Sequence, residues 1–274
     1  MSVSSATPVR GDPHRAALQA LNDGGVPYLL GGAYALQVQL GVILREVKDL
    51  DLFVRPRDVD AALAALRKAG YDTALTFPHW LAKAWAGDEF IDVIFSSGNG
   101  VVTIDDGWFR HADEVELFGL PVLLCPGEEG IWARAFVMER ERYDGADVAH
   151  LLRCCAERLD WSRLIERFAG HWRVLLAHLI LFGFIYPSER DRVPRWVMEH
   201  LAALLAGENA DTPPPDRVCQ GTLLSRAQFL IDVQRWGYAD ARLQPRGNLT
   251  GEQAEEWTRA IEDPEIVRSL PARP

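Results

Sequence analysis

The sequence predicts an α/β (α+β) fold in which a mixed sheet with flanking helices is followed by an all-helical domain. Strand-like and helix-like segments alternate up to about residue 124, as they do when helices pack on a sheet. From Pro126 the pattern changes to consecutive helices, and 206–215 (AGENADTPPP) has the composition of a loop. We therefore expect a sheet domain over residues 1–125, a helical domain over 126–205, and a linker with C-terminal helices over 206–274.

Local signals justify each element of the first part. Asp12-Pro13 is a typical helix start, and the glycines after Asn22-Asp23 end that helix. Gly70 ends a later helix, and Gly87-Asp88 is typical of a hairpin turn. After the first helix we expect, in order, strand 27–30, helix 33–40, strand 50–54, helix 57–69, strand 71–76 and hairpin strands 79–86 and 89–95.

Apolar residues at helical spacing predict the elements of the second part. Thr250 precedes the last of them and is a suitable N-terminal cap. The expected helices are 127–139, 144–157, 161–168, 172–184, 194–205, 222–236 and 252–261.

The composition is that of a soluble globular protein, with 48% hydrophobic and 25% charged residues. A formal charge of −10 argues against a broad nucleic-acid surface, although it is compatible with a nucleotide bound through a metal and a few basic side chains. The four cysteines show neither zinc-site nor disulfide spacing. The apolar run 174–186 is shorter than the roughly 20 residues of a membrane helix. Without an apolar signal core at the N-terminus, we expect a cytoplasmic protein.

Asp49 and Asp51 are the first candidate site residues. They lie in a strand pattern with Leu50 and Leu52 between and after them, so both carboxylates point to one face, roughly 6.6 Å apart at the backbone. Two such carboxylates repel by about 4 kcal/mol at a half-buried site. A cation is therefore expected to neutralise them, and Mg²⁺ prefers oxygen ligands shared with phosphates.

Asp92 is the third candidate, because a lone acid in the apolar strand FIDVIF is costly unless it is paired or binds a metal. Three converging carboxylates suit two Mg²⁺ ions roughly 3.5–4 Å apart, one on a triphosphate and one at an acceptor hydroxyl. The alternative is structural: Asp49 and Asp51 form an exposed strand end, and Asp92 pairs with Arg45 or Lys48.

Gly31-Gly32 stands at the corner between a strand and a short helix. Glycines there let the backbone approach a phosphate, and the free N–H groups of the next helical turn bind anions. Lys48 is a candidate phosphate contact, or else a solvated lysine at a strand edge.

The order Gly31-Gly32, helix, Arg45, Asp49-Leu50-Asp51 and a later strand with Asp92 resembles the nucleotidyltransferase superfamily that includes DNA polymerase β. The variant LLGGAYALQVQLG…REVKDLDLFV is similar to lincosamide nucleotidyltransferases and to nucleotidyltransferases of toxin–antitoxin systems. The similarity covers about residues 25–95 and extends weakly to 150.

The resemblance implies a nucleotidyltransferase domain over 1–125 in which Asp49 and Asp51 bind both metals and Asp92 binds the second, near the acceptor. It also implies that Gly31 and Gly32 contact the triphosphate, with Arg45 as a further nucleotide-binding candidate. Many relatives have Gly-Ser at this corner and use the hydroxyl, which Gly32 lacks.

A second cluster, RERYDGADVAH, places Asp144 and Asp147 near the start of a helix, preceded by Arg142. It resembles a basic residue followed by Asp-x-x-Asp in the toxin-like relatives, and would bind the base or the acceptor. The structural alternative is that Asp144 caps the helix and Asp147 pairs with Arg140 or Arg142.

These observations predict a nucleotidyltransferase that moves a nucleoside monophosphate from an NTP to an acceptor hydroxyl, with Mg²⁺ or Mn²⁺ as cofactor. The acceptor is a small molecule, a tRNA or a protein, and an antitoxin-type partner is expected for a toxin-like member. The competing hypothesis is a catalytically inactive module that binds a nucleotide or a partner. The sequence leaves the nucleotide, the acceptor and the oligomeric state open.

Overall fold

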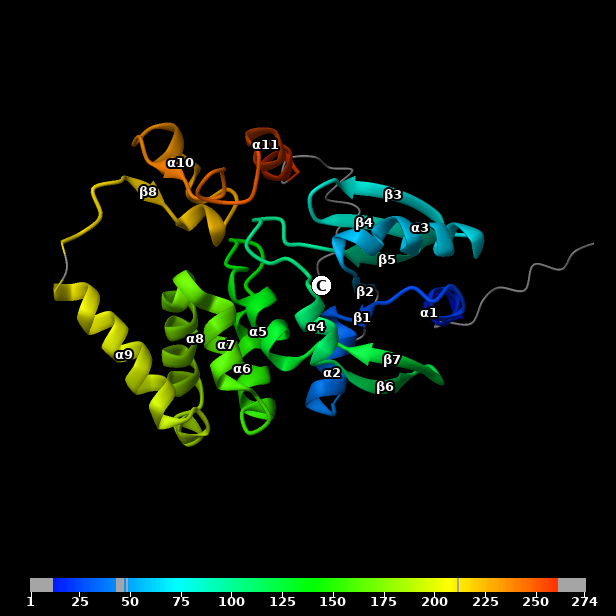
Figure 1. Ribbon diagram of the computed structural model, residues 1–274, viewed down its shortest axis with the longest axis horizontal. Coiled ribbons are helices and arrows are strands. Elements are labelled where there is room, and N and C mark those ends of the chain that lie inside the picture. The colour runs from blue at the N-terminus through cyan, green and yellow to red at the C-terminus, as the bar shows by residue number, and fades with distance from the viewer. Residues whose placement is uncertain (1–11, 43–46, 48, 211, 261–274) are drawn as a thin grey trace, which may run out of the picture.

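The computed structural model describes residues 12–42, 47, 49–210 and 212–260, and contains a seven-stranded mixed sheet with the order β3-β4-β5-β2-β1-β7-β6 (Figure 1). β2 and β5 run parallel, as do β1 and β7, whereas the remaining neighbours are antiparallel. The expected α/β class is thus confirmed. The strands are β1 Leu29–Leu30, β2 Leu50–Phe53, β3 Asp72–Phe77, β4 Leu81–Ala86, β5 Glu89–Ile94, β6 Asp113–Leu117 and β7 Leu120–Leu124.

The two faces of the sheet are covered by different helices. α1 (Asp12–Asp23) and α3 (Val59–Lys68) cover one face, where Leu50, Leu52 and Ile91 belong to their core. The opposite face meets α2 (Gly32–Leu40), α4 (Asp106–Arg110) and the helices that follow, with which Leu29, Phe53 and Trp108 share a core. Because strand side chains alternate, Asp51, which lies between Leu50 and Leu52, points to the face covered by α2, α4 and the later helices, called the helical side below.

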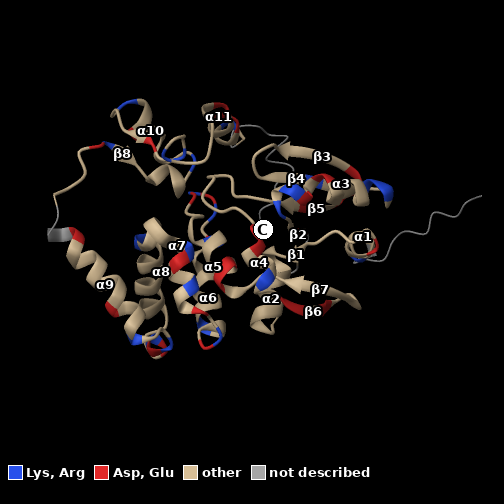
Figure 2. Cartoon of the chain, in the orientation of Figure 1, with Lys and Arg blue, Asp and Glu red and all other residues tan. Residues whose placement is uncertain are grey.

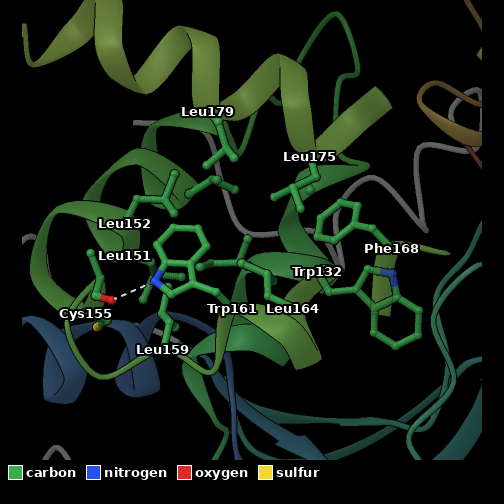
Figure 3. Packing of buried hydrophobic residues seen from close by; sticks show 14 of the residues in the cluster. Trp132, Leu151, Leu152, Cys155, Leu159, Trp161, Leu164, Phe168, Leu175 and Leu179 are labelled. Atoms are coloured by element: carbon green, nitrogen blue, oxygen red, sulfur yellow. Dashed lines mark hydrogen bonds between the residues drawn. The ribbon is translucent and has the colours of Figure 1, made fainter. Parts of the chain in front are cut away.

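The core shared by the helical region and this face of the sheet contains tryptophan, phenylalanine and leucine side chains (Figure 3). Trp161 lies within it and donates a hydrogen bond from Nε1 to the Ala156 carbonyl over 3.0 Å. The helices are α5 Gly127–Ala135, α6 Gly145–Cys155, α7 Trp161–Phe168, α8 Trp172–Ile185 and α9 Arg195–Ala210. α9 thus continues into the stretch that its composition predicted to be a loop.

One helical run, Trp161–Ile185, is long and apolar enough to cross a membrane by length and composition alone. It joins α7 to α8 and is longer than the apolar run considered in the sequence. Trp161, Leu164 and Leu175 nevertheless pack in the protein core, and core helices of soluble proteins have the same composition. The cytoplasmic location stays a prediction.

The C-terminal segment differs most from expectation. The single helix over 222–236 is wrong: a 3-10 turn, Gly221–Leu223, and α10, Leu230–Gln234, are separated by non-helical residues. Tertiary hydrogen bonds explain the break, because Ser225 Oγ donates to Glu139 over 2.6 Å and the Leu224 carbonyl accepts from the Met138 amide over 3.0 Å. β8 (Val218–Cys219) and β9 (Ala239–Asp240) pair in parallel. Thr250 caps α11 (Gly251–Arg259), as expected.

Candidate active site

Asp51 and Asp92 lie directly opposite each other on the parallel neighbours β2 and β5. The residues flanking each acid along its strand are buried on the α1–α3 face, so both carboxylates point to the helical side of the sheet. The structure therefore brings together two of the three expected carboxylates through strand register. Asp49 precedes β2, is half-buried, and acts electrostatically on both of them.

Asp51 and Asp92 both have raised pKa values. Burial raises the pKa of Asp51 to about 7, and the neighbouring charges of Asp92 and Asp49 contribute to the rise. The pKa of Asp92 is also raised, first by burial, although a lysine beside it acts in the opposite direction. Among the described side chains no group of three or more His, Cys, Asp or Glu is arranged to hold a metal ion. The three-carboxylate metal site stays a prediction.

Lys83 is the lysine beside Asp92. It lies opposite Asp92 on the antiparallel neighbour β4, and its Nζ is 2.8 Å from Asp92 Oδ1. Its ammonium also lies 4.6 Å from the centre of the Phe90 ring. Lys83 was not among the expected site residues, yet pairing outward from the Gly87-Asp88 turn places it opposite Asp92. The register of the hairpin was therefore the missed signal.

The Gly31-Gly32 corner lies against the strand that carries Asp51. The Gly31 amide donates to the Asp51 carbonyl over 2.8 Å. Gly32 begins α2 with a φ of +53°, and a Cβ atom there would be 1.6 Å from Asp51 Oδ2. A serine does not fit this backbone position, because its side chain would overlap the Asp51 carboxylate. Both the left-handed conformation and the close approach thus require glycine at position 32.

Arg134 connects this corner to Asp147. From α5 its Nη2 donates to the Gly32 carbonyl over 2.6 Å, and its Nε lies 3.5 Å from Asp147 Oδ2 on α6. The structural alternative expected Asp147 to pair with Arg140 or Arg142. Its partner is instead Arg134, because α5 packs against α6 and places Arg134 beside Asp147. Arg134 was missed, since only the fold places this helix beside the glycine corner.

Asp144 stands at the N-terminal cap position of α6, but its side chain makes no capping hydrogen bond. It instead accepts two bonds from Arg142, over 2.9 Å to Nε and 2.8 Å to Nη2. The acids Asp144, Asp51 and Asp147 raise the pKa of Arg142. Arg142 in turn lowers the pKa of Asp51 and of Asp92. The second cluster therefore lies close enough to the carboxylates of the sheet for their charges to interact, and its part in nucleotide binding stays a prediction.

The remaining expected nucleotide contacts, Arg45 and Lys48, lie outside the described residues. Basic and acidic residues are otherwise interspersed on the elements around the site (Figure 2).

A family model described as an uncharacterised nucleotidyltransferase matches residues 15–181, which is more than half of the chain. The chain belongs to this nucleotidyltransferase family. The matched region contains the Gly31-Gly32 corner, Asp49, Asp51, Asp92 and the Arg142 cluster. The protein is accordingly a nucleotidyltransferase enzyme, and the resemblance found in its sequence is confirmed.

Several solved structures are similar to this nucleotidyltransferase. The antibiotic-resistance factor ANT(2'')-Ia in solution is 18% identical, covering 63% of this chain and 96% of that protein with a TM-score of 0.43. The lincosamide antibiotic adenylyltransferase LnuA, bound to lincomycin, is 14% identical, covering 53% and 98% with a TM-score of 0.38. A tRNA-processing enzyme is 15% identical, covering 96% and 77% with a TM-score of 0.29. No curated protein matches the sequence.

Proposed function

We propose that this nucleotidyltransferase transfers a nucleoside monophosphate from an NTP to an acceptor hydroxyl, with Mg²⁺ or Mn²⁺ as cofactor. The observation that carries the proposal is the Asp51–Asp92 pair, opposed on neighbouring parallel strands, with the Gly32 backbone lying against Asp51. An acidic pair with raised pKa values beside the start of a helix suits a ligand that brings both phosphates and a cation.

Asp49 and Asp51 are the residues that would hold the divalent cation. They fit it, because like-charge crowding raises the pKa of Asp51 and a cation removes that penalty. Mg²⁺ is commonly bound by one or two carboxylates together with substrate phosphates. When bound, it neutralises charge on the phosphates during transfer.

The chain's own groups would perform the remaining steps. Asp92 accepts the proton of the acceptor hydroxyl, whose oxygen forms a new bond to the α-phosphorus of the NTP. The bond from the α-phosphorus to the bridging oxygen breaks, and pyrophosphate leaves with that electron pair. The backbone N–H groups in the first turn of α2 hold the phosphates in position. Positioning and charge neutralisation thus supply most of the catalysis.

The helical side would hold the nucleotide through its arginines. Arg142 faces the sheet carboxylates while its side chain remains exposed, so it is accessible to a triphosphate. Asp144 binds Arg142, and Asp147 pairs with Arg134. These acids would therefore contribute to nucleotide binding by positioning the two arginines. For Arg45 and Lys48, phosphate contact stays a prediction.

Labelled nucleotides test the proposal. The purified protein is incubated with each NTP carrying a radioactive α-phosphate, Mg²⁺ and cell extract, and the extract is then separated into small molecules, RNA and protein. We expect the label to enter one fraction, which identifies the acceptor class. Label from a γ-phosphate should enter none, because it leaves with pyrophosphate.

Asp51→Asn and Asp60→Asn are the matched pair of variants for this assay. Asp60 lies exposed on α3, so its loss should leave labelling unchanged, whereas Asp51→Asn should abolish it. Equal labelling by both variants contradicts the proposed role of Asp51. A wild-type protein that binds NTP but labels nothing supports the competing inactive module.

An antitoxin-type partner is a further expectation, tested by copurification with the product of the neighbouring gene.

A further inference from the structure

Lys83 is a buried cation that the expected two-metal site does not use. Only 9% of its side chain is exposed, and its Nζ lies 2.8 Å from Asp92 Oδ1. Burying an ammonium is costly unless it is paired, and here Asp92 and the face of the Phe90 ring stabilise the charge. Hairpin register sets this contact, because Lys83 and Asp92 are directly opposed on β4 and β5.

The contact limits what Asp92 can bind. A carboxylate oxygen that accepts an ammonium hydrogen bond is occupied on that side, so a divalent ion at the same oxygen would have to displace Lys83 or lie beside it. Two positive ions in that space repel strongly at low dielectric. Lys83 and a second metal ion therefore compete for Asp92 Oδ1.

We propose that Lys83 replaces the second divalent ion, so that this nucleotidyltransferase uses one divalent cation, held by Asp49 and Asp51, while Lys83 orients Asp92 toward the acceptor hydroxyl. The inference rests on the proposed function and deepens it. Lys83 acts as a positioning residue: it fixes one oxygen of Asp92 and leaves the other for the hydroxyl proton.

Counting bound Mn²⁺ tests the inference without measuring activity. The protein is saturated with an NTP analogue whose α–β bridge is a methylene group, and bound Mn²⁺ and nucleotide are measured by equilibrium dialysis. We expect one Mn²⁺ per bound nucleotide for the wild type. Lys83→Met, which removes the ammonium but keeps much of the volume, should bind two, because Asp92 becomes available to a metal.

Two controls accompany this measurement. Lys68→Met removes an exposed lysine of α3 and should keep one Mn²⁺ per nucleotide. Lys83→Arg retains a cation beside Asp92 and should also keep one. Thermal unfolding of each variant shows whether it folds, and if Lys83→Met does not, the wild-type and Lys83→Arg counts still decide.

The outcomes separate this inference from the proposed function. Two Mn²⁺ per nucleotide in the wild type, or only one in a folded Lys83→Met protein, overturns the role of Lys83 while nucleotide transfer stands. Absence of label transfer in the wild type overturns the proposed function whatever the Mn²⁺ count. A purely structural Lys83 predicts a lower melting temperature for Lys83→Met with an unchanged count, which also rejects the inference.

Discussion

Two groups of buried acids in this protein differ in how their charge is compensated. At the start of α5, Glu128 and Glu129 are buried, and Arg163 of α7 binds both of them over 2.5 Å. Arg167 adds a contact of 3.0 Å to Glu129 and extends to Asp105. At the sheet, Asp49, Asp51 and Asp92 have Lys83 and the more distant arginines as compensating charges.

The difference separates a structural ion network from a site that requires a ligand. Buried charges matched by arginines connect α4, α5 and α7, and losing one partner leaves another uncompensated. Crowded carboxylates with raised pKa values instead store an electrostatic penalty that a bound cation relieves.

The largest effect is expected for Asp51→Asn. Asparagine keeps the shape but removes the charge, so transfer should fall by at least about 1,000-fold, a barrier change of about 4 kcal/mol. The metal-free protein should not lose stability at neutral pH, because a repelling charge is removed. Label transfer and thermal unfolding measured on the same sample check both statements, and a strongly destabilised variant would contradict the comparison.

Glu129→Ala should show the opposite pattern. It leaves Arg163 and Arg167 without their shared carboxylate, which is expected to cost about 3–5 kcal/mol of unfolding free energy. Urea denaturation measures the loss. As a control, Glu208→Ala removes an exposed acid of α9 that pairs with Arg173 of α8, and should change the unfolding free energy by less than about 1 kcal/mol. Similar losses of unfolding free energy for both variants would show that the buried ion network stabilises the fold no more than an exposed ion pair does.

The pH dependence of stability should also carry the signature of Asp51. Its pKa in the folded protein is about 7, above the ordinary value of 3.8, so the fold favours the protonated form. The unfolding free energy of the metal-free protein should therefore fall as pH rises from about 4 to about 7, by up to roughly 4 kcal/mol at about 1.4 kcal/mol per pKa unit. Asp51→Asn should flatten this slope, and Mg²⁺ should offset it at high pH. A slope unchanged in the variant would rule out Asp51 as its source.

The smallest effect is expected for Asp147→Ala. Without Asp147, Arg134 is held less firmly at the Gly32 carbonyl, and transfer should fall about tenfold, or about 1.4 kcal/mol in the barrier. Stability should change less than for Glu129→Ala, because the pair is 3.5 Å long and Arg134 keeps its hydrogen bonds to the Gly32 and Gly130 carbonyls. Glu199→Ala, in the exposed Arg195–Glu199 pair of α9, is the control and should leave transfer intact. Lost stability with full activity would assign Asp147 a purely structural role.

The local pattern of the sequence determined much of the site. Alternation of apolar and acidic residues placed Leu50 and Leu52 in the core and Asp51 on the other face, because strand geometry has a period of two. The tight corner between β1 and α2 could be predicted from Gly31 and Gly32, because glycine readily adopts a positive φ such as that of Gly32. The Gly87-Asp88 turn also fixes the register of β4 and β5, so the position of Lys83 opposite Asp92 could have been predicted from the sequence.

Tertiary structure alone decided which distant segments meet. β2 and β5 are separated by a helix and a hairpin, and only their pairing opposes Asp51 and Asp92. Arg134 reaches Gly32 because α5 packs against α6, which in turn packs against α2, and no local pattern predicts this arrangement. The segment around Ser225 has helical periodicity but not a helix, because bonds to Glu139 and Met138 hold its backbone elsewhere. Local sequence specifies φ, ψ and side-chain faces, whereas contacts between remote residues depend on how all the apolar faces are buried together.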